Sequence, residues 1–343
     1  MKSILLILLM APVLAQAQLA RDSVLVNERS IDRPVIVHDR QLRITGGYDF
    51  STLSSRFDET GDKIKLSSEG RANILHHTFI DLRYGFFELL QLNVAFNYKS
   101  NVQREQPIII FAAPEPAIQV NEENRLTGME DIFVGVDFLV PLKTRKIDLA
   151  LSLGVSAPTA KSETVQPSHA FEDLGDTQVI SYNNNLNRGV GVVMTFLGAQ
   201  FKYRLKDFAF TTFFRYGFPT AETENFEWRF RLVNDEFEYR SRIFNLAPAN
   251  TYFGLVEIEY QLFPWIDLFL DIEQTGTSGG WSDETGQKVA FRDERLTFIN
   301  PGIEILLTSR FWLRQKVVFA IEGENAMTPF SVQTALIYNL FPF

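Results

Sequence analysis

Apolar and polar residues alternate without interruption along the segment Leu89–Lys99. The apolar positions are Leu90, Leu92, Val94, Phe96 and Tyr98, and every residue between them except Ala95 is polar. Successive side chains of a β-strand point to opposite faces, so the segment predicts a strand with one apolar face and one polar face. About a dozen segments repeat this pattern, which predicts an all-β protein.

The alternation predicts twelve strands, with ten or fourteen as alternatives, because segment boundaries are uncertain by a few residues. Their expected ranges are Gln41–Phe50, Asn73–Tyr84, Leu89–Lys99, Gly128–Val140, Ile147–Ala157, Gly189–Arg204, Phe208–Phe218, Thr251–Gln261, Ile266–Thr275, Arg295–Leu307, Lys316–Glu322 and Phe330–Leu340. Short turns alternate with long loops, as in bacterial outer-membrane barrels. The alternation at Phe226–Leu232 predicts strands that rise beyond the membrane rather than a further span.

The expected fold is a transmembrane antiparallel up-and-down β-barrel. A sheet in lipid has to close, because unpaired backbone groups at an open edge are too costly in hydrocarbon. A secreted β-sandwich is the alternative, but its outward face would be polar. Aromatic residues at strand ends favour the barrel, whose interfaces carry aromatic girdles: Tyr48, Tyr84, Phe86, Tyr98, Tyr203, Phe208, Tyr216, Tyr260, Trp265, Phe311 and Trp312.

The N-terminus predicts export. Met1–Ala17 combines Lys2, a short apolar run and a small-x-small ending, which indicates a secretory signal peptide. We expect residues 18–40 to be a periplasmic segment, as a flexible leader in preference to a plug in the barrel, and residues 41–343 to form the barrel. The predicted location is therefore the outer membrane of a Gram-negative bacterium, crossed many times.

Composition narrows the chemistry. The net charge is −9, which argues against nucleic acid as a partner. The absence of cysteine removes a lipoprotein anchor, a disulfide framework and a cysteine nucleophile. The mean hydropathy of −0.04 fits a barrel, in which lipid-facing and lumen-facing residues balance.

The segment Gly128–Ala160 carries a weak motif. Gly128, Asp131, Pro158 and Thr159 fit a G-x-x-D strand, a short turn, an apolar strand and a Pro-Thr-Gly ending, although Ala160 replaces the usual glycine. In this it resembles the "meta-pathway of phenol degradation" family of outer-membrane proteins. The resemblance implies a transport-type barrel, loosely grouped with channels for hydrophobic solutes.

The C-terminal residue also carries a resemblance. Phe343 resembles the aromatic terminus that barrel assembly machinery recognises, although Pro342 is atypical. The expected partners are therefore this machinery, outer-membrane lipid and lipopolysaccharide, and a small-molecule solute.

The predicted lumen is charged. The candidate solute pathway comprises nine inward residues: Glu257, Glu259, Asp271, Glu273, Glu304, Arg43, Arg83, Arg204 and Arg215. Two interpretations remain open: an acidic wall facing a basic wall, whose field orients polar solutes, or paired charges that simply fill a narrow barrel. Further inward positions are acidic at Asp267 and Glu322, basic at Lys99 and Lys202, and aromatic at Phe213, Phe253, Phe269 and Phe298.

The sequence offers little for other chemistry. Adjacent His76 and His77 point to opposite faces, so we expect no metal site and no cofactor. Ser168-His169 is the one Ser–His neighbour pair, and we expect it to be a solvated loop rather than a catalytic pair. The apolar loop stretch Pro107–Pro116 predicts the crown of a tall hairpin, with a constriction of the lumen or a partner contact as alternatives.

The chain is therefore predicted to be a passive channel and not an enzyme. A non-conducting docking barrel that acts through its loops is the alternative. An outer-membrane hydrolase acting on lipid or peptide is the less favoured one.

Overall fold

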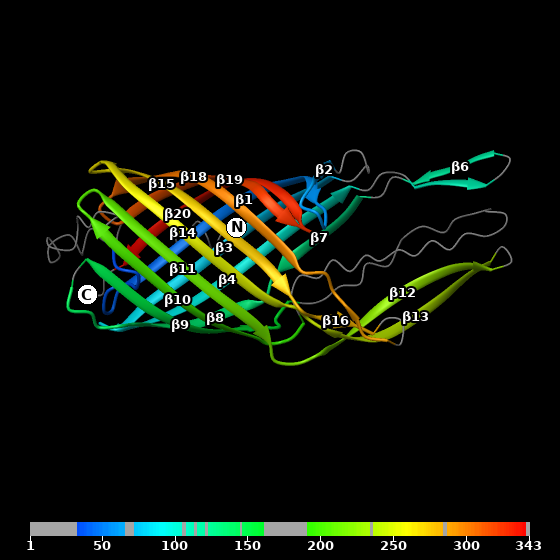
Figure 1. Ribbon diagram of the computed structural model, residues 1–343, viewed down its shortest axis with the longest axis horizontal. Helices are drawn as coiled ribbons and strands as arrows, with labels where there is room; N and C mark the ends of the chain where they lie inside the picture. The colour runs from blue at the N-terminus through cyan, green and yellow to red at the C-terminus, as the bar shows by residue number, and fades with distance from the viewer. Residues whose placement is uncertain are drawn as a thin grey trace, which may run out of the picture.

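The computed structural model describes residues 33–65, 72–104, 108–112, 115–120, 123–144, 146–160, 191–233, 236–283 and 287–340. Within these ranges the regular elements are all β-strands, and they build a closed antiparallel barrel with hairpins projecting from one end (Figure 1). Among the described residues, no helix has the length and hydropathy that a transmembrane helix needs.

Twelve described strands form the barrel wall, which confirms the predicted number. In chain order they are β1 (Leu42–Phe57), β3 (Ala72–Phe87), β4 (Leu90–Arg104), β8 (Ile132–Leu139), β9 (Ile147–Ala157), β10 (Met194–Leu205), β11 (Phe208–Pro219), β14 (Asn250–Phe263), β15 (Ile266–Ser278), β18 (Glu294–Thr308), β19 (Phe311–Glu324) and β20 (Met327–Leu340). The first strand, β1, pairs with both β3 and β20, so the sheet has no open edge.

The outer wall of the barrel is apolar. Val134, Val136 and Phe138 on β8 are 41–44 % exposed, and Leu151 and Leu153 on β9 are 50–56 % exposed. A β-sandwich would place such residues inside, so these exposures exclude that alternative. The twelve strands therefore cross the membrane with their apolar faces in lipid.

The connections at the two barrel ends differ as predicted. Two-residue turns join β3 to β4, β10 to β11, β14 to β15 and β18 to β19 at one end. Exposed aromatic pairs gather near these turns, with ring centroids 4.7 Å apart for Phe208 and Tyr260, and 6.0 Å apart for Phe263 and Trp265. Trp312 is an exception to the predicted girdle, because it is only 4 % exposed and lies inside the barrel.

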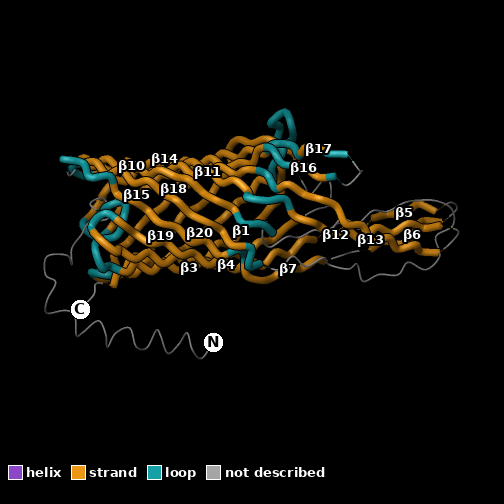
Figure 2. Tube along the Cα trace, turned by 90° about the horizontal axis from the view of Figure 1, so that it is seen from below, coloured by secondary structure: helices purple, strands orange, loops and turns teal. Residues whose placement is uncertain are grey.

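The long connections carry strands of their own. Hairpins β5 (Ile108–Ala112) with β6 (Glu115–Val120) and β12 (Thr223–Val233) with β13 (Glu236–Ala247) project beyond the barrel (Figures 1 and 2). Both predicted projections are thus observed as hairpins. The remaining short strands are β2 (Lys63–Lys65), β7 (Glu123–Met129), β16 (Trp281–Ser282) and β17 (Val289–Ala290).

The motif residues of Gly128–Ala160 close one hairpin end. The expected single strand over Gly128–Val140 is broken into β7 and β8 at Glu130 and Asp131, although both parts pair with β4. The amide of Ala160 donates to Oδ1 of Asp131, and the amide of Ile132 donates to Oγ1 of Thr159, each at 3.0 Å. Asp131 and Thr159 therefore join the ends of β8 and β9.

Candidate functional site

The polar face of each strand lines the lumen. Glu257 and Glu259 on β14, Asp271 on β15 and Glu304 on β18 are between 1 % and 9 % exposed. Glu273 also points inward and accepts a hydrogen bond from Nζ of Lys316 at 2.6 Å. The structure thus places all five predicted acidic residues inside the barrel, and their part in a solute pathway stays a proposal.

Arg314 on β19 binds these acids together. Its guanidinium group forms an ion pair with Glu257, lies 3.5 Å from a carboxylate oxygen of Glu304, and lies 3.7 Å from one of Asp271. The guanidinium carbon also lies 3.8 Å from the centre of the Phe269 ring, within cation–π range. One cation therefore contacts carboxylates from three different strands.

The acidic and basic side chains are interleaved around the lumen. Lys316 pairs with Asp271 at 3.3 Å and with Glu273 at 2.6 Å, and Lys202 on β10 pairs with Glu259 at 3.4 Å. This arrangement favours the paired-charge interpretation over two opposed walls. Isolated charges in a narrow lumen would pay a large desolvation cost, which the pairing offsets.

The N-terminal segment enters the same lumen. Val35, Ile36 and Val37 are 1–4 % exposed, and Val35 and Ile36 pack with Ala150 of β9. The flexible leader expected for residues 18–40 is therefore wrong for the part that the structure describes, 33–40. The alternative of a plug in the barrel was harder to predict, because this stretch has no periodic pattern and its apolar residues resemble those of any short loop.

Polar contacts fix the segment at both ends. Arg33 forms an ion pair with Glu304, and its backbone oxygen accepts a 3.0 Å hydrogen bond from Nη2 of Arg204. The amide of Val35 donates to Asp148 at 3.2 Å, and that of Val37 donates to Oε1 of Gln91 at 2.7 Å. Side chains of the barrel wall thus form hydrogen bonds with backbone groups of a segment that is not paired in the sheet.

The predicted basic residues divide into three environments. Arg204 pairs with Asp148 beside the N-terminal segment. Arg43 on β1 and Arg83 on β3 are directly opposite each other in the sheet; Arg43 donates to Oδ1 of Asn339 and Arg83 to Asp81. Arg215 lies elsewhere, with its guanidinium carbon 5.2–5.9 Å from the ring centres of three phenylalanines: Phe133, Phe196 and Phe213.

Inward aromatic rings lie against the wall where glycine faces the lumen. A Cβ added to Gly302 would overlap the ring of Phe269, and one added to Gly47 would overlap the ring of Phe79. Phe298 is buried, and Phe213 and Phe253 have ring centroids 5.7 Å apart. The missing side chains of Gly302 and Gly47 therefore leave room for the rings of Phe269 and Phe79 to lie against the wall.

One cavity of about 290 Å³ lies inside the lumen beside residues 33–35. Its lining combines the charged residues described above with Phe79, Thr45, Thr211 and Ile337. It is the volume of about ten water molecules in the liquid, so a small organic molecule fits.

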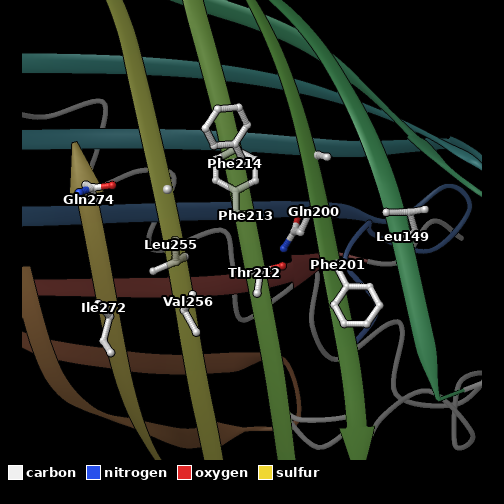
Figure 3. A pocket seen from close by; sticks show the side chains of 12 residues that line it. Leu149, Gln200, Phe201, Thr212, Phe213, Phe214, Leu255, Val256, Ile272 and Gln274 are labelled. Atoms are coloured by element: carbon white, nitrogen blue, oxygen red, sulfur yellow. The ribbon is translucent and has the colours of Figure 1, made fainter. Parts of the chain in front are cut away.

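A larger depression of about 420 Å³ lies in the wall formed by β9 to β11, β14 and β15 (Figure 3). Phe201, Phe214, Val256 and Ile272 around it are 37–53 % exposed, and a Cβ added to Gly254 in its lining would meet no atom within 4 Å. Because these side chains belong to the apolar outer face, the depression faces lipid and is not part of the lumen.

Other predicted positions have a definite place. His77 lies inside the barrel with Nε2 3.5 Å from Glu130, which also lies 3.6 Å from Lys99. His76 faces the other way, where Nδ1 lies 2.5 Å from the hydroxyl of Tyr48. Asp267 is buried, whereas the Glu322 side chain is 62 % exposed and pairs with Arg295 near the barrel rim. Ser168, His169 and Phe343 lie outside the described residues.

Sequence reasoning missed two groups that organise the lumen. Arg33 lies in the segment without a pattern, and Arg314 precedes Lys316, where the last-but-one strand was expected to begin. The spacing of Arg314 and Lys316 by two is the signal that could have extended that strand. Trp312 obscures this signal, because an aromatic residue at a strand end is more typical of the outer girdle.

Comparison with solved structures supports the fold. An outer membrane channel from Pseudomonas putida F1 matches with a TM-score of 0.61 and 13 % identity, over 89 % of this chain and 97 % of that one. A TodX deltaS2S3 mutant monoaromatic hydrocarbon channel matches with a TM-score of 0.53 and 10 % identity, over 93 % and 94 % of the two chains. At such identities the likeness concerns the fold alone, which is an outer-membrane β-barrel.

The comparisons of sequence found no relative of this chain. No family model matches this chain. No curated protein matches it either. The resemblance of Gly128–Ala160 to a transport-type barrel therefore agrees with the fold shown by the structures and rests on no family model.

Proposed function

We propose that the protein is an outer-membrane channel through which small solutes pass passively. The observation that carries the proposal is a closed barrel, apolar outside, whose polar lumen holds a cavity of about 290 Å³. A barrel that served only as an anchor has no need of such a space. The similar barrel from Pseudomonas putida F1 is described as a channel, and the similar TodX mutant as a monoaromatic hydrocarbon channel.

The N-terminal segment closes this channel in our proposal. Residues 33–38 occupy the lumen, and the contacts that retain them are a few ion pairs and hydrogen bonds, not strand pairing. Such contacts exchange with water or with solute groups far more readily than a barrel strand leaves its sheet. The segment thus acts as a plug that yields while the wall stays closed.

The proposal includes the route of the chain to the membrane. Residues 1–17 direct export, Phe343 contributes to recognition by barrel assembly machinery, and the outer wall contacts lipid and lipopolysaccharide. The predicted transport function requires no catalytic step and no cofactor, since a concentration gradient drives it.

A non-conducting docking barrel is the second candidate. It is favoured by the dense pairing around Arg314 and by the buried Val35–Val37, which both occupy space in the lumen. In that case the projecting hairpins β5–β6 and β12–β13 would carry the function.

Conductance of the refolded mature protein in a planar bilayer separates the candidates. The comparison is between residues 18–343 and a variant that lacks residues 18–40. We expect discrete openings in both, longer and larger after the deletion. Silence of both variants, with circular dichroism showing intact β-structure, would refute the channel and favour the docking barrel.

A further inference from the structure

A second lumen cavity lies around Arg215, toward the end of the barrel from which the hairpins project. Its volume is about 330 Å³, and among the described residues it shares no lining residue with the cavity beside residues 33–35. Arg215 follows Thr211 of that first cavity along β11, in the direction of the projecting strand β12. The two cavities therefore lie at different depths in the lumen.

Arg215 is a cation that has no ion pair with any described residue. Its guanidinium group packs instead against the three phenylalanine rings described above. Asp81 acts on it electrostatically, but Asp81 accepts a hydrogen bond of 2.8 Å from Nε of Arg83. Because aromatic faces are weak acceptors, the five N–H donors of Arg215 remain available to a solute.

The rings around Arg215 are closely packed. A Cβ added to Gly154 would overlap the ring of Phe133, and one added to Gly217 would overlap the ring of Phe196. The same two rings meet edge to face, with centroids 5.7 Å apart. Close packing leaves them little room to move away from the guanidinium group, so Arg215 is held at the cavity.

Glu294 supplies the opposite charge. It lies at the start of β18, lines the same cavity, and forms no ion pair with another described residue. The remaining charged residue of the lining is Arg295, which is matched by Glu322 at 3.0 Å. The unmatched charges of the lining are therefore one cation and one anion, and their sum is zero.

The size of the cavity suits a molecule that carries both charges. A sphere of about 330 Å³ is about 9 Å across. The charged groups of an α-amino acid, with a hydrogen bond of about 3 Å at each end, span a similar length. Ligand sites of this volume are at the small end of those that proteins form.

Glu294 is also accessible from outside the barrel. It lines a further cavity of about 530 Å³ at the rim, between the turn after β1 and the connection from β17 to β18. A solute that enters from the rim therefore meets the carboxylate of Glu294 before it reaches Arg215.

The uncharged part of the lining favours an organic solute over a pair of inorganic ions. Separate ions would leave its apolar side chains in contact with water, whereas the aliphatic part of an amino acid covers them. Hydroxyl groups beside them provide further donors and acceptors. These apolar and hydroxyl side chains belong to Phe196, Phe253, Leu296, Thr251, Thr275 and Thr277.

We infer that this cavity binds a small apolar α-amino acid as a zwitterion, with its carboxylate at Arg215 and its ammonium group at Glu294. The inference rests on the proposed passage of solutes and names one chemical class among them. A solute with only one of the two charges leaves either Arg215 or Glu294 without a partner, so it binds more weakly.

Leucine is a suitable probe, because each of its charged groups can be deleted without changing its aliphatic part. The analogue 4-methylpentanoate lacks the ammonium group, and 3-methylbutylamine lacks the carboxylate. Isothermal titration of the refolded mature protein is expected to show that leucine binds and that each analogue binds at least about tenfold more weakly. A factor of ten is the smallest effect expected of a hydrogen bond to a charged group.

Two variants assign the charges to their residues. Arg215→Gln is expected to weaken leucine binding by about tenfold and to abolish the preference for leucine over 3-methylbutylamine. Glu294→Gln is expected to weaken it similarly and to abolish the preference for leucine over 4-methylpentanoate. Because neither residue has an ion pair, neither change leaves a buried charge unmatched, and both variants are expected to fold.

Arg292→Gln is the matched control, because its ion pair with Glu59 is exposed at the same rim and it does not line the cavity. It is expected to leave leucine binding unchanged. Three results would each overturn the inference: no leucine binding, equal binding of leucine and either analogue, or unchanged leucine binding in both cavity variants with intact circular dichroism.

Conductance distinguishes failure of the site from failure of the channel. Openings without leucine binding would refute the zwitterion site and leave the channel standing. Leucine binding that depends on Arg215 and Glu294, in a protein that stays silent in both full-length and truncated forms, would support the site and refute passage.

Discussion

Arg314 on β19 forms an ion pair with Glu257 on β14, although β18 and β15 lie between these two strands. The guanidinium group passes over the intervening wall and contacts Asp271 and Glu304 on the way. Ion pairs across the lumen therefore connect non-adjacent strands at the level of the N-terminal segment, in addition to the hydrogen bonds of the sheet.

Replacing Arg314 by glutamine is expected to destabilise the barrel strongly. The change leaves three carboxylates near one another in a narrow lumen without their shared cation, and breaking a buried pair typically costs about 3–5 kcal/mol. Urea-induced unfolding in lipid vesicles measures the loss. Arg295→Gln, which breaks the exposed pair with Glu322, is the control and should cost about 0–1 kcal/mol. Equal effects of the two changes would contradict the role given to Arg314.

The hydrogen bond between Gln91 and the N-terminal segment offers a second test. Gln91 on β4 is 1 % exposed, accepts the amide of Val37, and donates to Asp137 at 2.7 Å. Gln91→Ala removes the acceptor, so the segment should leave the lumen more often and channel openings should become more frequent. Gln315→Ala is the control, because its one described side-chain bond lies on the exposed face. Unchanged opening frequency in Gln91→Ala would show that this bond does not hold the plug.

The alternation of the sequence predicted the barrel well because two solvents enforce it. Lipid outside and polar lumen inside require opposite chemistry at successive residues, so segments such as Ile147–Ala157 have the same bounds in the structure as in the prediction. The pattern fails where that requirement lapses. Gly128–Val140 is interrupted at Glu130 and Asp131, and the carboxylate of Asp131 accepts a hydrogen bond from the amide of Ala160 at the hairpin end.

The lumen was less predictable than the wall. Alternation assigns a side chain to a face, but it does not say which partner it meets across the barrel. The pairing of Arg314 with Glu257 depends on the register of three strand pairs, β19–β18, β18–β15 and β15–β14, and the reach of a long side chain. Arg33 illustrates a further limit, because a segment without hydrogen-bonded strand partners has no period to recognise.

The turn after β1 has a measurable pH response outside the membrane. Oδ1 of Asp58 accepts hydrogen bonds from the amide and hydroxyl of Thr60 and from the amide of Asp62, at 2.7–2.9 Å. These bonds lower the pKa of Asp58 below its ordinary value. The turn is therefore stabilised above the ordinary aspartate pKa, and this stabilisation is lost as pH falls through the lowered one. A carboxyl titration by NMR that gives an ordinary pKa for Asp58 would contradict this account.

A charged substitution on the outer wall should lower the free energy of unfolding by an amount that depends on its depth in the bilayer. Leu153, in the middle of β9, is 56 % exposed to lipid, whereas Leu142 lies in the turn after β8. Leu153→Arg should cost about 2–4 kcal/mol of unfolding free energy, and Leu142→Arg about 0–1 kcal/mol, because lipid rejects a guanidinium group most strongly at the bilayer midplane. Urea unfolding in vesicles compares the two. Equal costs would mean that β9 does not cross the bilayer as described.

Two glycines allow a matched test of how tightly the lumen is packed: Gly302 faces the lumen, and Gly254 faces lipid. A Cβ at Gly302 would overlap the Phe269 ring and the backbone oxygen of Gln315, whereas a Cβ at Gly254 meets nothing within 4 Å. Gly302→Ala should destabilise the barrel by about 1–3 kcal/mol, because the ring and the neighbouring strand have to shift.

The displaced ring of Phe269 also moves toward the guanidinium group of Arg314, so Gly302→Ala should reduce conductance as well as stability. Gly254→Ala adds one methyl group to the open lipid-facing depression and should change neither property. Unfolding in urea and single-channel recordings on the same two preparations test both expectations. If the two alanine variants behave alike, the Phe269 ring does not depend on the space that Gly302 leaves.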